Sequence, residues 1–132
     1  MFEENVELAR RAFAAISARD LDAFLELMDP EVIVVPRILA VEGGELRGHE
    51  GVRRWWDSIV GVFPDFDIEV IGIRAGRDWT VSEARARGRG EASGSGFEDA
   101  IWVAARLREG RVVRWQTFES EAEAVEASES GS

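Results

Sequence analysis

Two adjacent tryptophans, Trp55 and Trp56, constrain the fold of this 132-residue chain more than any other feature. They lie in a segment, Gly48 to Phe63, whose apolar residues recur at the spacings of a helix. Consecutive residues on a helix point about 100° apart, so one narrow apolar stripe cannot bury both rings. The helix therefore needs two apolar neighbours, or it leaves one tryptophan on the surface.

Two further helices and a strand are predicted before this segment. Phe2 to Ala18 carries apolar residues at spacings of three and four, which predicts a helix. Asp20 is a suitable N-cap for a second, shorter helix from Leu21 to Met28, and Pro30 is expected to stop it. Glu31 to Pro36 is a continuous apolar run rich in β-branched residues, which predicts a strand buried on both faces.

The second half of the chain reads mostly as strands. The predicted strands are Phe66–Ile73, Trp79–Gly90, Phe97–Leu107 and Arg111–Ser120. Turn-forming residues separate them, so an antiparallel meander is expected, and Gly43-Gly44 likewise predicts a loop or short hairpin over Arg37 to Arg47. Helices come first and strands mostly follow. The fold class is therefore α+β, a strongly curved antiparallel or mixed sheet wrapped around three helices of the N-terminal half.

Length and charge limit the domain organisation and the partners. One domain is predicted over residues 1–120, followed by an acidic Ser/Glu tail, 121–132, that begins helically and then frays. The net charge of −10 disfavours a nucleic-acid partner, and no run of about 20 apolar residues predicts a membrane span. There is no cysteine for a thiolate metal site. The N-terminus lacks the pattern of a secretory signal, so the cytoplasm is the expected location.

Four segments resemble the SnoaL-like branch of the nuclear transport factor 2-like proteins. They are ARDLDAFLELMDPEV, RGHEGVRRWW, FPDFDIEV and REGRVVRWQTFES, and the resemblance covers roughly residues 4–127. It implies a cone-shaped α+β barrel with a largely apolar pocket inside. Many members pair through the outer face of the sheet, so a homodimer through that face is expected. The family contains isomerases, cyclases, hydrolases and dehydratases, so the fold does not specify a reaction.

The acid/base residues of the isomerase-like members are missing from this chain. By rough alignment their first-strand acid falls on Pro36, their second acid on Val103 and their helix tyrosine near Ala12. The acid of the polyketide cyclases also falls near Val103, and the sequence contains no tyrosine. An enzyme built on this chain would therefore use different residues.

Strand alternation indicates which side chains face the predicted pocket. If Val103 faces inward, Asp99 and Ile101 do too, whereas Trp102 faces outward. Trp115, Thr117 and Glu119 would share the inner face of the last strand. The predicted ligand pocket is formed by Phe13, Val34, Pro36, Trp56, Ile101, Val103, Trp115, Thr117 and Glu119.

Asp99 and His49 are the candidate catalytic residues. An apolar cavity disfavours the charged form of a carboxyl and raises its pKa, so Asp99 could transfer protons; alternatively it is solvated or paired to an arginine at the start of its strand. His49, the only histidine, would lie in the first turn of a helix, where the dipole favours a neutral ring that could act as a base; alternatively it is a solvated helix-start residue. One histidine with scattered acids predicts no metal site, and no cofactor is expected.

Three functions remain open from the sequence. The first is a module that binds a small apolar or ring-shaped molecule in a conical pocket. The second is an enzyme of isomerase, cyclase or hydrolase type that uses Asp99 or His49. The third is a dimeric structural domain whose cavity is filled by its own side chains. An apolar lining with few polar groups is typical of ligand sites and favours the first. Arg85, Arg87 and Arg89 are expected to pair with acids on neighbouring strands or across a dimer.

Overall fold

The computed structural model describes residues 2–36, 44–60, 66–89 and 96–129, and confirms the α+β class. In chain order the elements are α1 (Glu3–Ser17), α2 (Leu21–Glu26), β1 (Met28–Val35), β2 (Leu46–Arg47), α4 (Gly48–Ile59), β3 (Asp67–Ala75), β4 (Trp79–Arg89), β5 (Gly96–Arg108), β6 (Arg111–Phe118) and α5 (Glu121–Glu129). Parts of two predictions, the loop at 37–43 and the helix end at 61–65, lie outside the described residues. No helix in the described ranges is long and apolar enough to span a membrane.

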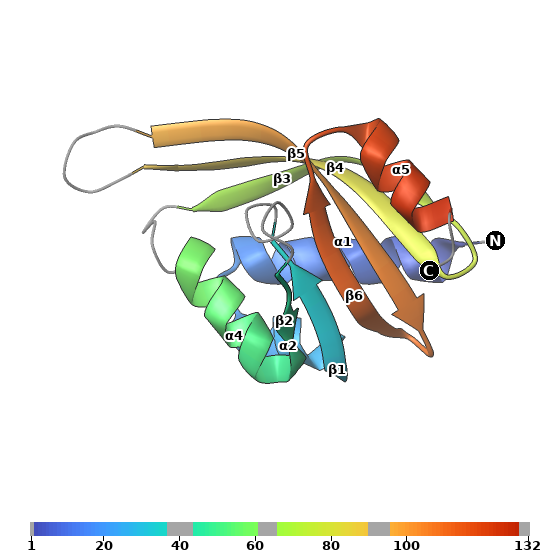
Figure 1. Cartoon of the computed structure of the whole chain (residues 1–132). Helices are drawn as coiled ribbons and strands as arrows, with labels where there is room; N and C mark the ends of the chain where they lie inside the picture. Colours follow the sequence, from blue (N-terminus) through green and yellow to red (C-terminus); the bar gives the residue numbers. More distant parts are fainter. Residues whose placement is uncertain (1, 37–43, 61–65, 90–95, 130–132) are drawn as a thin grey trace.

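The strands form one curled sheet in the order β2-β1-β6-β5-β4-β3 (Figure 1). β1 runs parallel to β6, and every other neighbouring pair is antiparallel. The sheet is therefore mixed, and the predicted meander of the last four strands is confirmed. The barrel that the resemblance implied is not closed, because β2 and β3 lie at opposite ends of the strand order and do not pair with each other.

The helix α4 has the two apolar neighbours that its adjacent tryptophans require. Trp55 and Trp56 are 6% and 7% exposed, so neither ring is left on the surface. Phe24 of α2 lies against both rings, with centroid distances of 5.6 and 5.5 Å. Trp115 of β6 lies 6.3 Å from Trp55 and 5.4 Å from Phe24, so the three rings form one cluster. The helix is thus held between α2 and the concave face of the sheet, and its wide apolar face explains the double tryptophan.

The start of α2 agrees with the sequence prediction, whereas β1 begins earlier than predicted. The Asp20 carboxylate accepts a hydrogen bond from the backbone N–H of Ala23 at 3.0 Å, which confirms the predicted N-cap. β1 begins at Met28, earlier than predicted, so Pro30 lies within the strand rather than between a helix and a strand. The register with β6 shifts between Met28 and Ile33. A proline fits there because an irregular stretch needs no ladder N–H from it.

The C-terminal segment packs on the convex face of the sheet, opposite the other helices (Figure 1). The tail, which was expected to begin helically, forms a nine-residue helix, α5, in contact with β5, β4 and β6. Its inward side is small: Ala124 and Ser128, one turn apart, are 0% and 5% exposed. They cover an outer apolar cluster that comprises Val81, Ala104, Trp79, Trp102, Phe118 and Val125. In a homodimer formed through this part of the outer face, the second copy would therefore contact α5, and α5 would separate it from Trp102.

Candidate functional site

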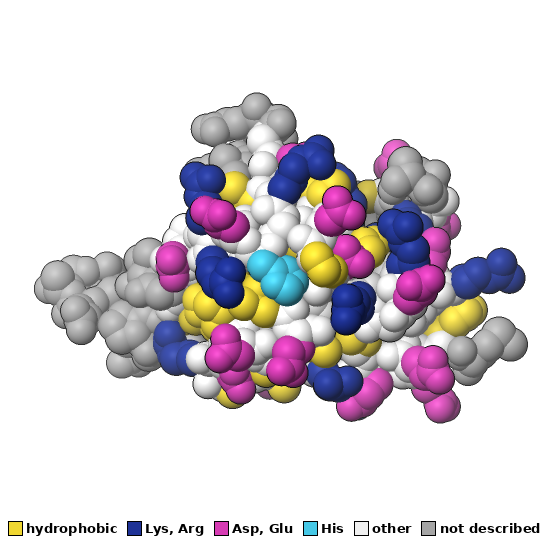
Figure 2. Space-filling view, turned by 90° about the horizontal axis from the view of Figure 1, so that it is seen from below, with side chains coloured by type: hydrophobic (Ala, Val, Ile, Leu, Met, Phe, Trp, Pro, Cys, Tyr) yellow, Lys and Arg dark blue, Asp and Glu magenta, His cyan; other side chains and the backbone are white. Residues whose placement is uncertain are grey.

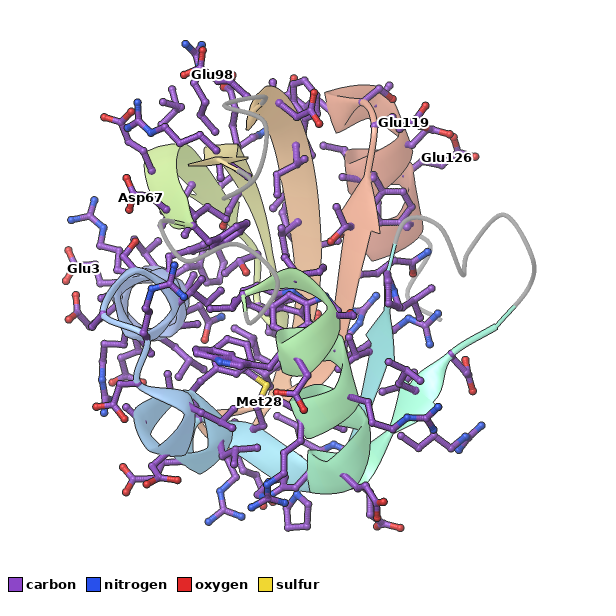
Figure 3. All side chains as sticks on the ribbon, turned by 90° about the vertical axis from the view of Figure 1, so that its left-hand side faces the viewer. Glu3, Met28, Asp67, Glu98, Glu119 and Glu126 are labelled. Atoms are coloured by element: carbon purple, nitrogen blue, oxygen red, sulfur yellow. The ribbon has the colours of Figure 1, made fainter. Side chains whose placement is uncertain are left out.

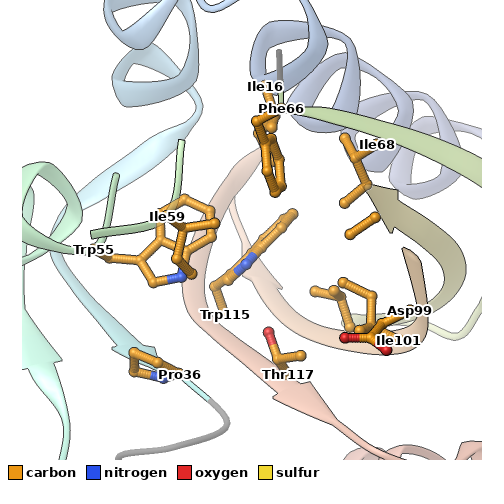
Figure 4. Close-up of a pocket in the computed structure, with 12 residues that line it drawn as sticks. Ile16, Pro36, Trp55, Ile59, Phe66, Ile68, Asp99, Ile101, Trp115 and Thr117 are labelled. Atoms are coloured by element: carbon orange, nitrogen blue, oxygen red, sulfur yellow. The ribbon is translucent and has the colours of Figure 1, made fainter. Parts of the chain in front are cut away.

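A cavity of about 240 Å³ lies between the helices and the concave face of the sheet (Figure 4). It is lined by Ile16, Pro36, Trp55, Ile59, Phe66, Ile68, Ala86, Asp99, Ile101, Val103, Trp115 and Thr117. All of these except Asp99 and Thr117 are apolar. A dry cavity of about 150 Å³ with aliphatic and aromatic walls already binds benzene, so this volume accommodates a molecule of one or two rings.

Strand pairing explains why the space opens at this point of the sheet. Alternation along β5 places Asp99, Ile101 and Val103 on the same face. Ala86 of β4 pairs directly with Asp99 and lines the same cavity. Its single methyl group leaves volume that a larger side chain would fill. The small side chain of Ala86 thus leaves part of the cavity's space unfilled on this strand.

The opposite wall is aromatic and tightly packed. Trp55 and Trp115 both line the cavity, and their ring planes meet at 66°. Behind them, Phe24 is 0% exposed and Phe13 is 3% exposed, with ring centroids 5.4 and 5.3 Å from Trp115. Side chains fixed by such packing lose little freedom when a ligand binds, so the wall is preorganised for a flat or ring-shaped molecule.

The indole nitrogen of Trp115 is an unusual feature of this wall. The atom Nε1 is buried and has no hydrogen-bond partner among the described residues. Figure 4 shows it on the ring edge turned toward Trp55 and Pro36, which both line the cavity. A buried donor without a partner costs about 1–3 kcal/mol. In the described part of the chain, Thr80 Oγ1 and Trp102 Nε1 share this state, but neither residue lines the cavity.

The structure places five of the nine predicted pocket residues on the cavity wall: Pro36, Ile101, Val103, Trp115 and Thr117. Trp55 takes the place expected for Trp56, because the turn of α4 directs Trp55 and Ile59, four residues apart, toward the sheet. Phe13 and Val34 are buried core residues that do not line the cavity. Glu119 is exposed, and Figure 3 shows it at the periphery of the molecule.

Six lining residues were not predicted from the sequence: Ile16, Trp55, Ile59, Phe66, Ile68 and Ala86. Two signals could have found some of them. Trp55 and Ile59 have the spacing of one helix face, and Ile68 of β3 alternates with Phe66, which directly precedes this strand. No comparable signal marks Ala86, since a small residue indicates a cavity only when the surrounding packing is known.

The two candidate catalytic residues are far from each other. Asp99 lines the cavity but is exposed, so its carboxylate lies at the open rim. His49 is in the first turn of α4, about 15 Å along the helix axis from the cavity residue Ile59. Its Nε2 lies 3.1 Å from the carbonyl oxygen of Met28, and because a carbonyl only accepts, this nitrogen carries the proton. The structure therefore places Asp99 at the cavity, whereas His49 links α4 to β1 through a hydrogen bond.

Arg87, in the middle of the arginine stripe on β4, lies among acidic side chains of the neighbouring strands. Arg87 lies 3.6, 3.5 and 3.7 Å from carboxylate oxygens of Asp67, Glu69 and Glu98, which are on the neighbouring strands as expected. Acidic and basic groups are interspersed over the face shown in Figure 2. Within the described ranges, no three histidine, cysteine or acidic side chains are grouped so that they could hold a metal ion.

The chain belongs to the SnoaL-like domain family, whose sequence profile matches residues 9–115. The search of curated proteins gives no match. Three solved structures share the fold. A candidate SnoaL-like polyketide cyclase from Jannaschia sp. CCS1 is 21% identical, with 98% of this chain and 94% of that chain covered and a TM-score of 0.77. A ketosteroid isomerase-like protein from Catenulispora acidiphila, in complex with trimethylamine, is 16% identical, with 93% and 92% covered and a TM-score of 0.75. TerC, co-crystallised with polyporic acid, is 19% identical, with 96% and 98% covered and a TM-score of 0.76.

Proposed function

We propose that this SnoaL-like domain binds a small apolar, ring-shaped molecule in the cavity between its helices and its sheet. The main support for the proposal is the aromatic wall that Trp55 and Trp115 form beside an unfilled space of about 240 Å³. Flat aromatic walls match ring-shaped ligands, and Asp99 and Thr117 supply the sparse polar groups that ligand sites usually contain. The co-crystal of TerC with polyporic acid is consistent with a role of this kind for the shared fold.

Tryptophan fluorescence tests the proposal, because two of the five tryptophans line the cavity. The purified chain is titrated with a panel of uncharged one-ring and two-ring compounds, and a saturable change is expected. In the variant Ala86→Leu the larger side chain occupies the cavity, so affinity should fall at least about tenfold. Ala100→Leu adds the same volume on the exposed side of β5 and should bind like the parent chain. No saturable change with any compound would contradict the proposal.

A second candidate function is catalysis of proton transfer, as in a cyclisation, isomerisation or hydration. It is favoured by Asp99, which lies at the rim of the cavity. Among the described residues that line the cavity, Asp99 is the one with a charged side chain. Once a ligand from the panel is known, related compounds can be tested for turnover. Asp99→Asn should then abolish turnover while binding is kept. Unchanged turnover in this variant would remove Asp99 from the mechanism.

The third possibility, a structural domain with a filled interior, predicts the opposite result. If side chains close the cavity in solution, Ala86→Leu should overpack the core and destabilise the chain by about 1–3 kcal/mol. If the cavity is open, the added leucine fills space and stability should hold or rise. Urea unfolding of this variant therefore separates the two accounts without any ligand.

A further inference from the structure

We propose that Arg19, just beyond the end of α1, is a positioning residue for the cavity, because its guanidinium group joins two chain segments that form one side of the wall. This inference rests on the proposed binding function and adds a residue that sets the geometry of the site. Arg19 Nη1 donates a hydrogen bond to the carbonyl oxygen of Val60 at 3.0 Å, and Nη2 donates one to the carbonyl oxygen of Phe66 at 3.4 Å. The side chain therefore connects the end of α4 to the residue that directly precedes β3.

Both carbonyl groups belong to the cavity wall or adjoin it. Phe66 lines the cavity, and Val60 directly follows the lining residue Ile59. Ile16, three residues before Arg19, lines the cavity from α1, and Figure 4 shows Ile16, Ile59 and Phe66 around the same space. Three segments of the chain thus meet at this side of the cavity, and Arg19, which follows the first of them, is hydrogen-bonded to the backbone of the other two.

The hydrogen bond to Val60 also supplies a positive charge that α4 lacks. The last carbonyl groups of a helix have no partner within the helix and carry a partial negative charge. The last turn of α4 contains no basic residue. The guanidinium group of Arg19 is placed at this end instead, so a side chain from the end of α1 stabilises the turn of α4 that carries Ile59.

The backbone of Arg19 indicates that ending α1 is not the only role of this residue. Its φ is 58°, in the left-handed region where a residue with a Cβ atom is disfavoured. The N–H of Arg19 donates to the carbonyl oxygen of Ile16 at 3.1 Å, and the N–H of Asp20 donates to that of Ala15 at 2.9 Å. This is a Schellman motif, in which glycine is the preferred residue at the left-handed position. Glycine would end the helix with less strain but has no side chain, so the two guanidinium contacts account for an arginine here.

Two glycine variants separate the side chain from the backbone. Arg19→Gly relieves the left-handed backbone and removes both hydrogen bonds. Glu109 provides the matched control, because its φ is 53° and it lies in the turn after β5, about 20 Å along the strand from the lining residue Val103. Glu109→Gly therefore relieves the same conformation and leaves the cavity wall unchanged.

Ligand affinity is the first measurement, made by isothermal titration calorimetry on the full chain. The probe is tetralin, an apolar two-ring compound, or, if the parent chain does not bind tetralin, the two-ring compound of the panel that it binds most tightly. Arg19→Gly should bind the probe at least about threefold more weakly than the parent chain, because its wall is less preorganised. Glu109→Gly should bind it like the parent chain. Arg19→Lys can reach one carbonyl group with its compact ammonium group and should recover part of the affinity.

Amide hydrogen exchange, followed by NMR without any ligand, is the second measurement. Exchange in the last turn of α4 should be faster in Arg19→Gly than in the parent chain and unchanged in Glu109→Gly. If Arg19→Gly fails to fold, Arg19→Asn takes its place, because asparagine tolerates the left-handed region and is too short to reach either carbonyl group.

The outcomes separate this inference from the function on which it rests. Unchanged affinity in Arg19→Gly, or unchanged exchange at the end of α4, would overturn the positioning role and leave the binding function standing. An equal loss of affinity in both glycine variants would overturn it too, since the guanidinium group would not be the cause. No binding of any panel compound by the parent chain would overturn the binding function and this inference with it. Weaker binding and faster exchange in the position-19 variant alone support the inference.

Discussion

Phe24 is the residue whose removal should disturb the site and the core together. It is 0% exposed, and its ring lies 5.6 Å from Trp55, 5.5 Å from Trp56 and 5.4 Å from Trp115. Replacing a buried phenylalanine by alanine usually costs about 3–5 kcal/mol, through lost transfer energy and the cavity left behind. Full burial and three aromatic neighbours place Phe24→Ala in the middle or upper part of that range, at about 4 kcal/mol.

A loss of this size is large for a domain whose total stability is of order 5–15 kcal/mol. With an unfolding entropy of about 2.1 cal/mol/K per residue and 132 residues, about 4 kcal/mol corresponds to a fall in Tm of about 14 °C. Urea unfolding followed by far-UV circular dichroism and by tryptophan fluorescence measures the change. Phe24→Leu, which keeps most of the volume, should cost about 1–1.5 kcal/mol.

Phe2 provides the matched control, since it is 37% exposed and Phe2→Ala should stay within about 0.5 kcal/mol of the parent chain. The reasoning is refuted if Phe24→Ala costs less than about 1.5 kcal/mol, or no more than Phe2→Ala. Either result would mean that the three tryptophan rings do not depend on Phe24 for their packing, and the preorganised wall of the cavity would lose its basis.

Two further predictions concern the parts of the chain outside the cavity. Ala124→Glu places a charge on the buried side of α5 and should release this helix, so that limited proteolysis cleaves the C-terminal segment early. Ala122→Glu, on the exposed side of the same helix, should be cleaved like the parent chain. Equal cleavage of the two variants would contradict the docking of α5. His49→Ala removes the hydrogen bond to the Met28 carbonyl and should cost about 1 kcal/mol in urea unfolding without changing ligand affinity. A loss of ligand binding or turnover in His49→Ala would contradict this account and indicate that His49 takes part in the functional site.

The sequence was a good guide to the elements and a weaker guide to the faces they present. The adjacent tryptophans indicated a helix with a broad apolar face, and Trp55 and Trp56 are indeed both buried. Which of them reaches the cavity depends on how α4 is rotated against the sheet, and that rotation is set by the partners of the helix rather than by its own spacing. Ala86 could not be recognised for a similar reason, because its importance lies in the volume that it does not fill.

Irregularities in the strands and the packing of the tail were also beyond the sequence patterns. Strict alternation would place Val113 on the inner face with Trp115, but a bulge pairs Leu107 with Val112, and Val112 is the buried residue at 1% exposure. The composition of the tail indicated fraying, and the small residues of α5 outweigh it because they allow close contact with the convex face. Trp102 is part of the cluster that α5 contacts. The substitution Trp102→Asp would therefore disturb the packing of α5, and it is not a clean test of a dimer formed through the outer face.

The most direct test of a ligand site between Trp55 and Trp115 is a crystal structure of the full chain soaked with the ring compound of the panel that binds most tightly. The account predicts electron density for the ring of this compound in the cavity lined by Ile101, Trp55 and Trp115. A cavity closed by its own side chains, or density for the compound only on the outer surface of the protein, would contradict it.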